Sequence, residues 1–177
     1  MINQLFTSEI RIKLLLKFFL NNETKSSWKS LKKEFGDSSD ELHAELKNME
    51  LEGLLCTSAE CSKKKYFANT SHELYIEIND RLKKRMGIDQ IINKVTSQIS
   101  DLQAAYLTDD CAMGIDSQII DLSLVGNQLD RVSILSLVKN AENFICRRIN
   151  YIILSSEEMT QCYQHKPVLQ IWQTNLN

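Results

Sequence analysis

The sequence predicts an α+β protein in three parts: a helical N-terminal domain ending in a β-hairpin (residues 1–70), a helical linker (71–100) and a small α/β domain (101–177). Apolar residues recur at helical spacing through the first two parts, which predicts amphipathic helices. In the third part, runs that favour β-strands are separated by a helical segment. That alternation is typical of a small mixed layer of strands and helices.

Three helices are expected in the N-terminal domain. Ser8 caps the first, and Ser26 or Ser27 caps the second. A turn at Gly36 precedes the third helix, which stops at Gly53. The buried face of the third helix, with apolar residues at i, i+4 and i+7, consists of Leu42, Leu46 and Met49.

The rest of the chain is expected to begin with a hairpin, with strands at 54–57 and 63–68 around a polar tip at 58–62. The linker consists of two helices, and the first carries an apolar stripe that exceeds the needs of a small domain. That stripe consists of Leu74, Ile78 and Leu82. The C-terminal domain has expected strands at 104–107, 119–125 and 150–154, a helix at 129–143, and a short helix capped by Ser155.

Charge is divided unevenly along a chain whose net charge is only −2. Residues 1–35 hold seven basic and three acidic residues, whereas residues 36–53 hold one basic and six acidic residues. Asp40, Glu41 and Glu45 of the third helix would repel phosphates. On that helix only His43 and Lys47 offset them. The acidic third helix therefore argues against DNA binding by this part of the surface.

The order of two short helices, a turn, a longer helix and a basic hairpin is that of a winged helix-turn-helix. Residues 5–80 resemble ArsR-like winged-helix regulators, mainly in LKNMELEGLL (Leu46–Leu55) and in the hairpin end YFAN (Tyr66–Asn69). The resemblance implies a homodimeric transcriptional regulator that binds double-stranded DNA with weak to moderate, salt-dependent affinity. The residues expected to contact DNA are Lys29, Lys32, Lys33, Ser39, His43, Lys47, Lys63, Lys64 and Lys65.

In one branch of that class, a minimal nucleotidyltransferase-like domain follows the winged helix. The segment TDDCAMGIDSQIIDLSLVG (Thr108–Gly126) resembles the active-site segment of this domain, which has a Gly-Ser pair, then Ala-Arg-Gly, then an Asp-x-Asp strand. Ala112 and Gly114 match the Ala and the last Gly. Asp121 matches the second metal-binding Asp. The departures are Ile119 for the first Asp, Asp109 and Asp110 for Gly-Ser, and Met113 for Arg.

These departures remove the parts that phosphoryl transfer needs. The reaction uses carboxylates on one face to hold the metal ions that neutralise the triphosphate. Asp116 lies five residues before Asp121, an odd offset, so the two side chains cannot share a face of a regular strand. The sequence therefore predicts a nucleotidyltransferase-like domain that is not an enzyme, with no catalytic residue, no metal and no cofactor.

The cysteines and the hydropathy indicate a cytoplasmic protein. There are five cysteines without a CxxC pair and no signal peptide, which predicts reduced thiols. Cys56 and Cys61 could form a bridge or half of a metal site, but the three histidines are scattered. The longest apolar run, Leu14–Leu20, is interrupted by Lys17 and is too short to span a bilayer. No membrane association is expected.

Two other functions stay open. The acidic third helix favours a protein-interaction or scaffold module that has lost tight DNA binding, since winged helices also serve in that role. Gly114, Asp116 and Asp121 leave room for a residual nucleotide-binding sensor or enzyme. The lysines of the hairpin favour the DNA-binding regulator.

Overall fold

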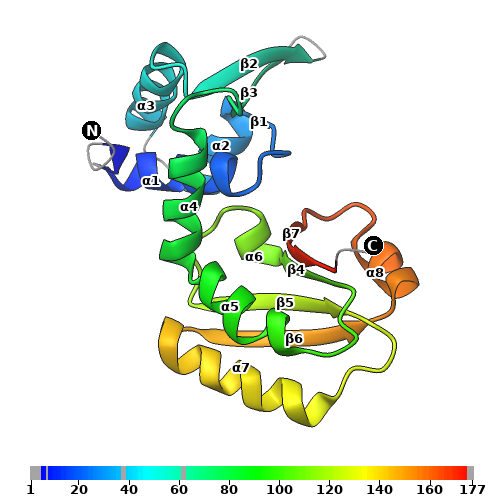
Figure 1. Cartoon of the computed structure of the whole chain (residues 1–177). Coiled ribbons are helices and arrows are strands. Elements are labelled where there is room, and N and C mark those ends of the chain that lie inside the picture. The colour runs from blue at the N-terminus through cyan, green and yellow to red at the C-terminus, as the bar shows by residue number, and fades with distance from the viewer. Residues whose placement is uncertain (1–4, 7, 37–38, 61–62, 175–177) are drawn as a thin grey trace. The chain divides into compact units, whose positions relative to one another are not determined.

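The structure, a computed structural model, describes residues 5–6, 8–36, 39–60 and 63–174. The chain divides into two compact units, Met1–Leu82 and Lys83–Asn177, each built around its own β-sheet (Figure 1). Helices and two sheets make the protein α+β, so the predicted class is confirmed. Within the described part of the chain, no helix combines the length and the apolar character that crossing a membrane requires.

The first unit begins with helices and ends with a hairpin followed by a long helix. Two serines cap its early helices as expected: Ser8 Oγ accepts from the backbone N–H of Arg11, and Ser27 Oγ accepts from that of Ser30. The elements in order are α1 (Glu9–Leu15), the π-helix η2 (Leu16–Leu20), β1 (Ser26–Ser27), α2 (Trp28–Phe35), α3 (Ser39–Leu51), β2 (Leu55–Glu60), β3 (Lys63–Ala68) and α4 (Tyr75–Met86), whose end belongs to the second unit.

Helix α3 is buried along the predicted stripe. Leu42, Leu46 and Met49 are at most 1% exposed, and the helix contacts α1, α2 and β2. Gly53, at φ +74°, ends it in the left-handed conformation that glycine tolerates best. The backbone N–H of Leu54 then donates to the carbonyl of Met49 (2.9 Å) and closes the helix end.

The sheet of the first unit has the order β1-β3-β2 and is antiparallel throughout. Strand β2 runs to Glu60, so the predicted polar tip at 58–62 is too long. Residues 61 and 62, with Cys61, lie outside the described residues. Strand β1 was not predicted. It has only two residues, so no alternation marks it, and it exists because Ser26 and Ser27 pair with Tyr66 and Lys65.

The apolar side chains of α1, η2 and α4 are largely buried within the protein. Every residue from Leu14 to Leu20 is buried, including Lys17, so all sides of the π-helix η2 face the interior. The predicted one-sided pattern is therefore too narrow. In α4, Ile78 and Leu82 are fully buried, so these two residues of the Leu74 stripe are not available to a partner.

The second unit is a four-stranded sheet with helices. The strand order is β6-β5-β4-β7, with β5 and β6 parallel and the other neighbours antiparallel. Two elements, α6 and β7, were not predicted. The elements are α5 (Ile88–Lys94), the 3-10 helix η3 (Thr96–Gln98), β4 (Ala104–Thr108), α6 (Asp109–Ala112), β5 (Ile119–Val125), α7 (Arg131–Ile145), β6 (Arg148–Leu154), α8 (Ser156–Tyr163) and β7 (Leu169–Gln173).

The two faces of this sheet differ. On β5, the even-numbered side chains from Ile120 to Leu124 are buried on one face. Odd-numbered side chains point to the other face, where Ser123 Oγ donates to Tyr163 Oη of α8 (3.4 Å). We call this second side the α8 face. It carries Asp121, and it is the face on which any chemistry of the resemblance would have to occur.

Candidate functional site

The residues expected to contact DNA lie on α2, α3 and β3. Lys29, Lys33, His43, Lys47 and Lys63 are exposed, and no ion pair holds any of these lysines within the described residues. The others are less available, or their side chains are outside the description: Lys32 and Lys65 are half-buried, Lys64 is in an ion pair, and the side chain of Ser39, the first residue of α3, is not described.

Arg11 forms ion pairs with one carboxylate of α3 and with Glu52, which follows the helix. Its guanidinium is buried (6% exposed), and Nη1 donates to Glu45 (2.7 Å) and to Glu52 (3.3 Å), while Nη2 also bonds Glu52. Burial lowers the pKa of Arg11, but the two carboxylates together outweigh it and raise that pKa above its ordinary value. His43 and Lys47 are the basic residues of α3 itself, as predicted, and Arg11 of α1 is a further cation that offsets Glu45.

A second ion pair links α3 to the hairpin. Lys64 Nζ lies 2.7 and 2.9 Å from the two carboxylate oxygens of Glu50 and also sits over the ring of Tyr66. The hydrogen bond to Glu50 is the main cause of the raised pKa of Lys64. Lys64 and Tyr66 are two residues apart on β3, so they share the face toward α3. The charge of Lys64 is therefore compensated by Glu50 within the protein.

Aromatic contacts join α2 to α3. The rings of Trp28 and His43 meet edge to face with their centroids 6.3 Å apart, and Lys32 Nζ lies 5.4 Å from the Trp28 ring. His43 and Lys47 are one turn apart on the exposed side of α3. Three of the residues predicted to contact DNA, Lys32, His43 and Lys47, therefore lie near one another around Trp28 and α3.

On the α8 face, the neighbours of Asp121 include the amide of Asn150 on β6 and the apolar side chain of Ile119 on β5. Asn150 is opposite it on the parallel strand β6, and Asn150 Nδ2 donates to Asp121 Oδ1 (3.1 Å). Ile119 is 41% exposed at the position where the resemblance expects the first metal-binding carboxylate. Asn150 was missed by the sequence analysis, because only the register of β5 and β6 places it beside Asp121.

The loop after β4 also departs from the resemblance. Asp109, in the place of the first Gly, adopts φ +51°, a left-handed conformation that costs most L-residues about 1–2 kcal/mol. Asp109 thus holds a backbone conformation that favours glycine. Cys111 follows it in α6 and is 1% exposed, and burial is the main cause that raises the pKa of this thiol to about 12. Cys111 is a protonated thiol at neutral pH.

The carboxylate of Asp116 forms ion pairs with two arginines. Its carboxylate lies 2.6 Å from Arg147 Nη2 and 3.4 Å from Arg85 Nε, and Arg147 also donates to the backbone carbonyl of Ser117 (2.8 Å). Among the described residues, no three His, Cys, Asp or Glu side chains are placed to hold a metal ion. A two-metal site of the kind that the resemblance implies does not fit these residues, and we derive no step through it.

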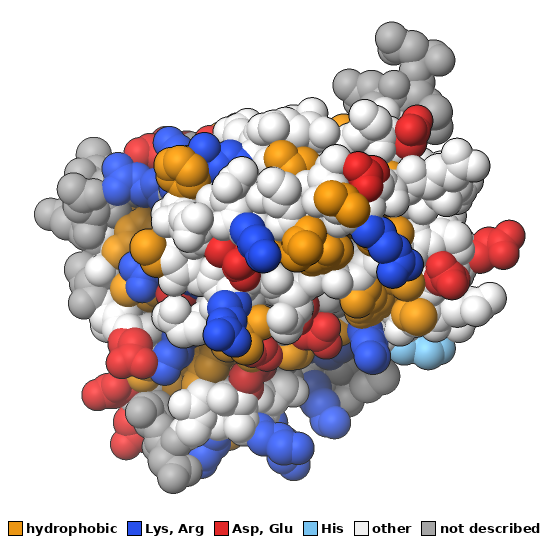
Figure 2. Space-filling view, turned by 90° about the horizontal axis from the view of Figure 1, so that it is seen from below, with side chains coloured by type: hydrophobic (Ala, Val, Ile, Leu, Met, Phe, Trp, Pro, Cys, Tyr) orange, Lys and Arg blue, Asp and Glu red, His pale blue; other side chains and the backbone are white. Residues whose placement is uncertain are grey.

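Charge does not cluster elsewhere on the visible surface. On the face shown in Figure 2, Lys and Arg side chains alternate with Asp and Glu, and hydrophobic side chains lie between them. Phosphate recognition uses clustered positive charge. The mixed charges of this face do not form such a cluster.

No family model and no curated protein matches this chain. Two solved structures are similar to it. One is the crystal structure of a toxin-antitoxin with AMP-PNP, 22% identical, covering 50% of this chain and 74% of that chain with a TM-score of 0.41. The other is a putative nucleotidyltransferase from Sulfolobus solfataricus, 19% identical, covering 55% of this chain and 88% of that chain with a TM-score of 0.38.

The prediction that this chain is not an enzyme is contradicted by these matches, one of which is to a putative nucleotidyltransferase, and it is not retained. The matches assign no substrate to this chain. Neither concerns ArsR-like regulators, so that resemblance rests on the residues quoted for it above.

Proposed function

We propose that the protein is a DNA-binding transcriptional regulator whose N-terminal unit is an ArsR-like winged helix-turn-helix. In this proposal α2 and α3 are the two helices of the motif, and the hairpin β2–β3 is the wing. The order of these elements and the short strand β1 that pairs with the hairpin support it. The division into a DNA-binding domain (1–70), a linker (71–100) and a C-terminal domain (101–177) belongs to the same proposal.

The observation that carries the proposal is the internal neutralisation of α3. Glu45 and Glu52 are bound by Arg11, and Glu50 is bound by Lys64. These three carboxylates share two cationic partners within the protein, so one negative charge of the group stays uncompensated by them. Coulomb repulsion from a paired carboxylate is largely cancelled by its partner at the distance of a phosphate. Of the three acids that argued against DNA binding, Glu45 is thus paired with a cation, whereas Asp40 and Glu41 stay exposed.

Lysines are exposed on each of α2, α3 and β3. Lys47 on α3, Lys29 and Lys33 on α2, and Lys63 at the start of β3 are positioned on the elements that approach the DNA backbone in this architecture. His43, one turn before Lys47, is the candidate for contact with a base edge. Asp40 and Glu41, exposed in the first turn of α3, limit the affinity, which supports weak to moderate binding.

The proposal includes a cytoplasmic homodimer. Because Ile78 and Leu82 are buried within the chain, the contact has to use other residues. Ile76 on α4 is 73% exposed and Leu51 at the end of α3 is 77% exposed. Light scattering at tens of micromolar is expected to give twice the chain mass. A monomer mass removes this part of the proposal.

The decisive measurement is a salt titration of DNA binding. Fluorescence anisotropy with a labelled random duplex, and with fragments that flank the protein's own gene, gives the slope of log affinity against log salt. Each lysine that neutralises a phosphate contributes about 0.9 to that slope. Replacing Lys47 and Lys63 together with Ala should therefore lower it by about two.

A matched control removes two positive charges from the other unit. Arg131 and Lys139 are exposed on α7, and their double Ala variant should leave the slope unchanged. If the Lys47 and Lys63 variant also leaves it unchanged, the surface does not contact DNA. A protein-interaction module, favoured by the exposed Leu51 and Ile76, then becomes the better explanation.

A second candidate function is nucleotide handling by the C-terminal unit. It is favoured by Asp121, a partly exposed carboxylate held in place by Asn150 on the α8 face. The test is incubation with labelled nucleoside triphosphates in magnesium or manganese buffer. Transfer of label that disappears in Asp121→Asn supports this candidate. If the native chain neither binds the labelled nucleotide nor transfers the label, this candidate is ruled out.

A further inference from the structure

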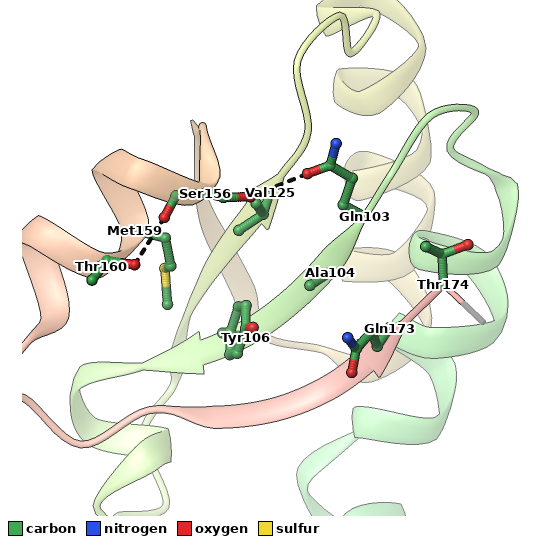
Figure 3. A pocket seen from close by; sticks show the side chains of 9 residues that line it. All are labelled: Gln103, Ala104, Tyr106, Val125, Ser156, Met159, Thr160, Gln173 and Thr174. Carbon is green, nitrogen blue, oxygen red and sulfur yellow. Dashed lines mark hydrogen bonds between the residues drawn. The ribbon is translucent and has the colours of Figure 1, made fainter. Parts of the chain in front are cut away.

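A cavity of about 450 Å³ opens on the α8 face of the C-terminal unit, between α8, β4, β5 and β7 (Figure 3). This volume is within the range of about 300–1,000 Å³ that small-molecule sites occupy. Its floor is apolar and aromatic, and its rim is made of amides and hydroxyls. The lining consists of Gln103, Ala104, Tyr106, Val125, Ser156, Met159, Thr160, Gln173 and Thr174.

A β-bulge shapes the rim. Between Ala105 and Tyr106 of β4 the register with β7 shifts, so that Ala104 pairs with Gln173 but Tyr106 pairs with Gln170. On a regular strand, residues three apart point to opposite faces. The extra residue in β7 turns both glutamines toward the cavity face. Gln170 Nε2 then donates to Gln173 Oε1 (2.7 Å).

Two amides of the rim are oriented as hydrogen-bond donors. The oxygen of Gln173 accepts from Gln170, and the oxygen of Gln103 accepts from Ser156 Oγ (3.2 Å), as the dashed line in Figure 3 shows. Because each amide oxygen is already engaged, each amide nitrogen is left to donate. No protein partner for these two nitrogens occurs within the described residues. A ligand with hydrogen-bond acceptors on one edge suits them.

None of the residues that line the cavity is charged, so the lining offers no ion pair to a charged ligand. The N-terminus of α8 is not an anion site either, because the capping box of Ser155 and Glu158 uses its backbone donors. Tyr106 and Met159 offer a ring and a thioether against which a flat ligand can pack. The chemistry of the lining therefore selects a neutral, planar, acceptor-bearing molecule.

The cavity is separate from the Asp121 region. It lies at the end of the strands where Ala104 pairs with Val125, whereas the loop of Asp109 follows the end where Thr108 pairs with Asp121. A ligand in the cavity would thus not occupy the place of the triphosphate in the resemblance.

We propose that this cavity binds an uncharged nucleobase, alone or as its nucleoside. The base would pack on Tyr106 and Met159 and accept hydrogen bonds from the amides of Gln103 and Gln173. Amide side chains read base edges in this way, and every base has a flat face for packing. This site goes beyond the proposed DNA binding and does not depend on it.

The experiment uses the full chain and isothermal titration with adenosine, guanosine, uridine and cytidine as separate probes. At least one is expected to bind with a Kd below about 1 mM. Thr160→Trp, an exposed position on α8 that lines the cavity, should fill it and weaken that binding at least tenfold. Gln161→Trp, the next residue on the same helix and outside the lining, is the matched control and should bind like the native chain.

A second variant tests the donor. Gln173→Leu removes one amide and should weaken binding by about five- to tenfold, the typical effect of one hydrogen bond. The proposal is overturned if no nucleoside binds below about 1 mM. It is also overturned if Thr160→Trp and Gln161→Trp bind alike, because binding would then lie outside the cavity.

Discussion

Replacing Glu50 with Gln should make the protein a more salt-sensitive DNA binder. In the native chain the carboxylate of Glu50 holds Lys64 Nζ at 2.7 and 2.9 Å. The pair carries no net charge, so it releases no counterion from DNA. Glu50→Gln removes the negative partner with almost no change in shape. Lys64 then becomes available to a phosphate.

The magnitude follows from counterion release. One additional phosphate contact adds about 0.9 to the slope of log affinity against log salt. Between about 50 and 200 mM salt, the affinity of the variant should therefore fall about 3.5-fold more than that of the native chain. The fold should tolerate the change, because Lys64 is 50% and Glu50 34% exposed, and a pair of this kind contributes about 0.2–1 kcal/mol.

The assay is anisotropy with a labelled random duplex over this salt range, with a thermal melt to confirm folding. Glu157→Gln, at an exposed residue of α8, makes the same change in net charge in the other unit. A slope that stays the same in Glu50→Gln, or rises equally in Glu157→Gln, would refute the reasoning that the hairpin lies on DNA with Lys64 neutralised.

Three further predictions concern stability, each measured as the free energy of unfolding in a denaturant melt. Leu46→Ala should lower it by about 2–5 kcal/mol, since this side chain is fully buried; a much smaller loss would mean that the α3 stripe is not core. Arg11→Met should lower it by about 2–3 kcal/mol, which is less than the loss for a fully buried pair because the side chain of Glu52 is 45% exposed. Adding Glu45→Gln to this variant should restore part of the loss. If the double variant is no more stable than Arg11→Met, the pairing of Arg11 with Glu45 is contradicted. Asp109→Gly should raise the free energy of unfolding by about 0.5–1 kcal/mol by relieving the left-handed backbone, and a decrease would show that the Asp109 side chain is itself stabilising.

Local patterns were enough to predict much of the first unit. Ser8 and Ser27 cap helices because a hydroxyl next to an orphan N–H is a local interaction. The stripe of Leu42, Leu46 and Met49 is buried because i, i+4 and i+7 lie on one side of any α-helix. Such features involve residues within about two turns of each other, so the sequence alone specifies them.

Asp121 and the departures around it were identified from the resemblance of Thr108–Gly126 to the active-site segment of a nucleotidyltransferase-like domain, and Asp121 lies on a strand as expected. Local patterns did not predict strand β7. The segment LQIWQ carries a bulge, and a bulge breaks the alternation by which a strand is recognised. Nor did they find Asn150, whose place beside Asp121 depends on the register of two strands.

Arg11 shows most clearly where the sequence stops being sufficient. Composition and spacing determined that α3 is acidic and amphipathic, and both statements hold. Whether its carboxylates face outward or are bound was decided by Arg11, which precedes Glu45 by 34 residues and Glu52 by 41. The physical reason is that electrostatic pairing depends on distance in space, and only the packing of α1 against α3 brings these groups within hydrogen-bond range. The sequence by itself determined most of the helices and strands and the charges that they carry; the tertiary structure decided which of those charges remain for a partner.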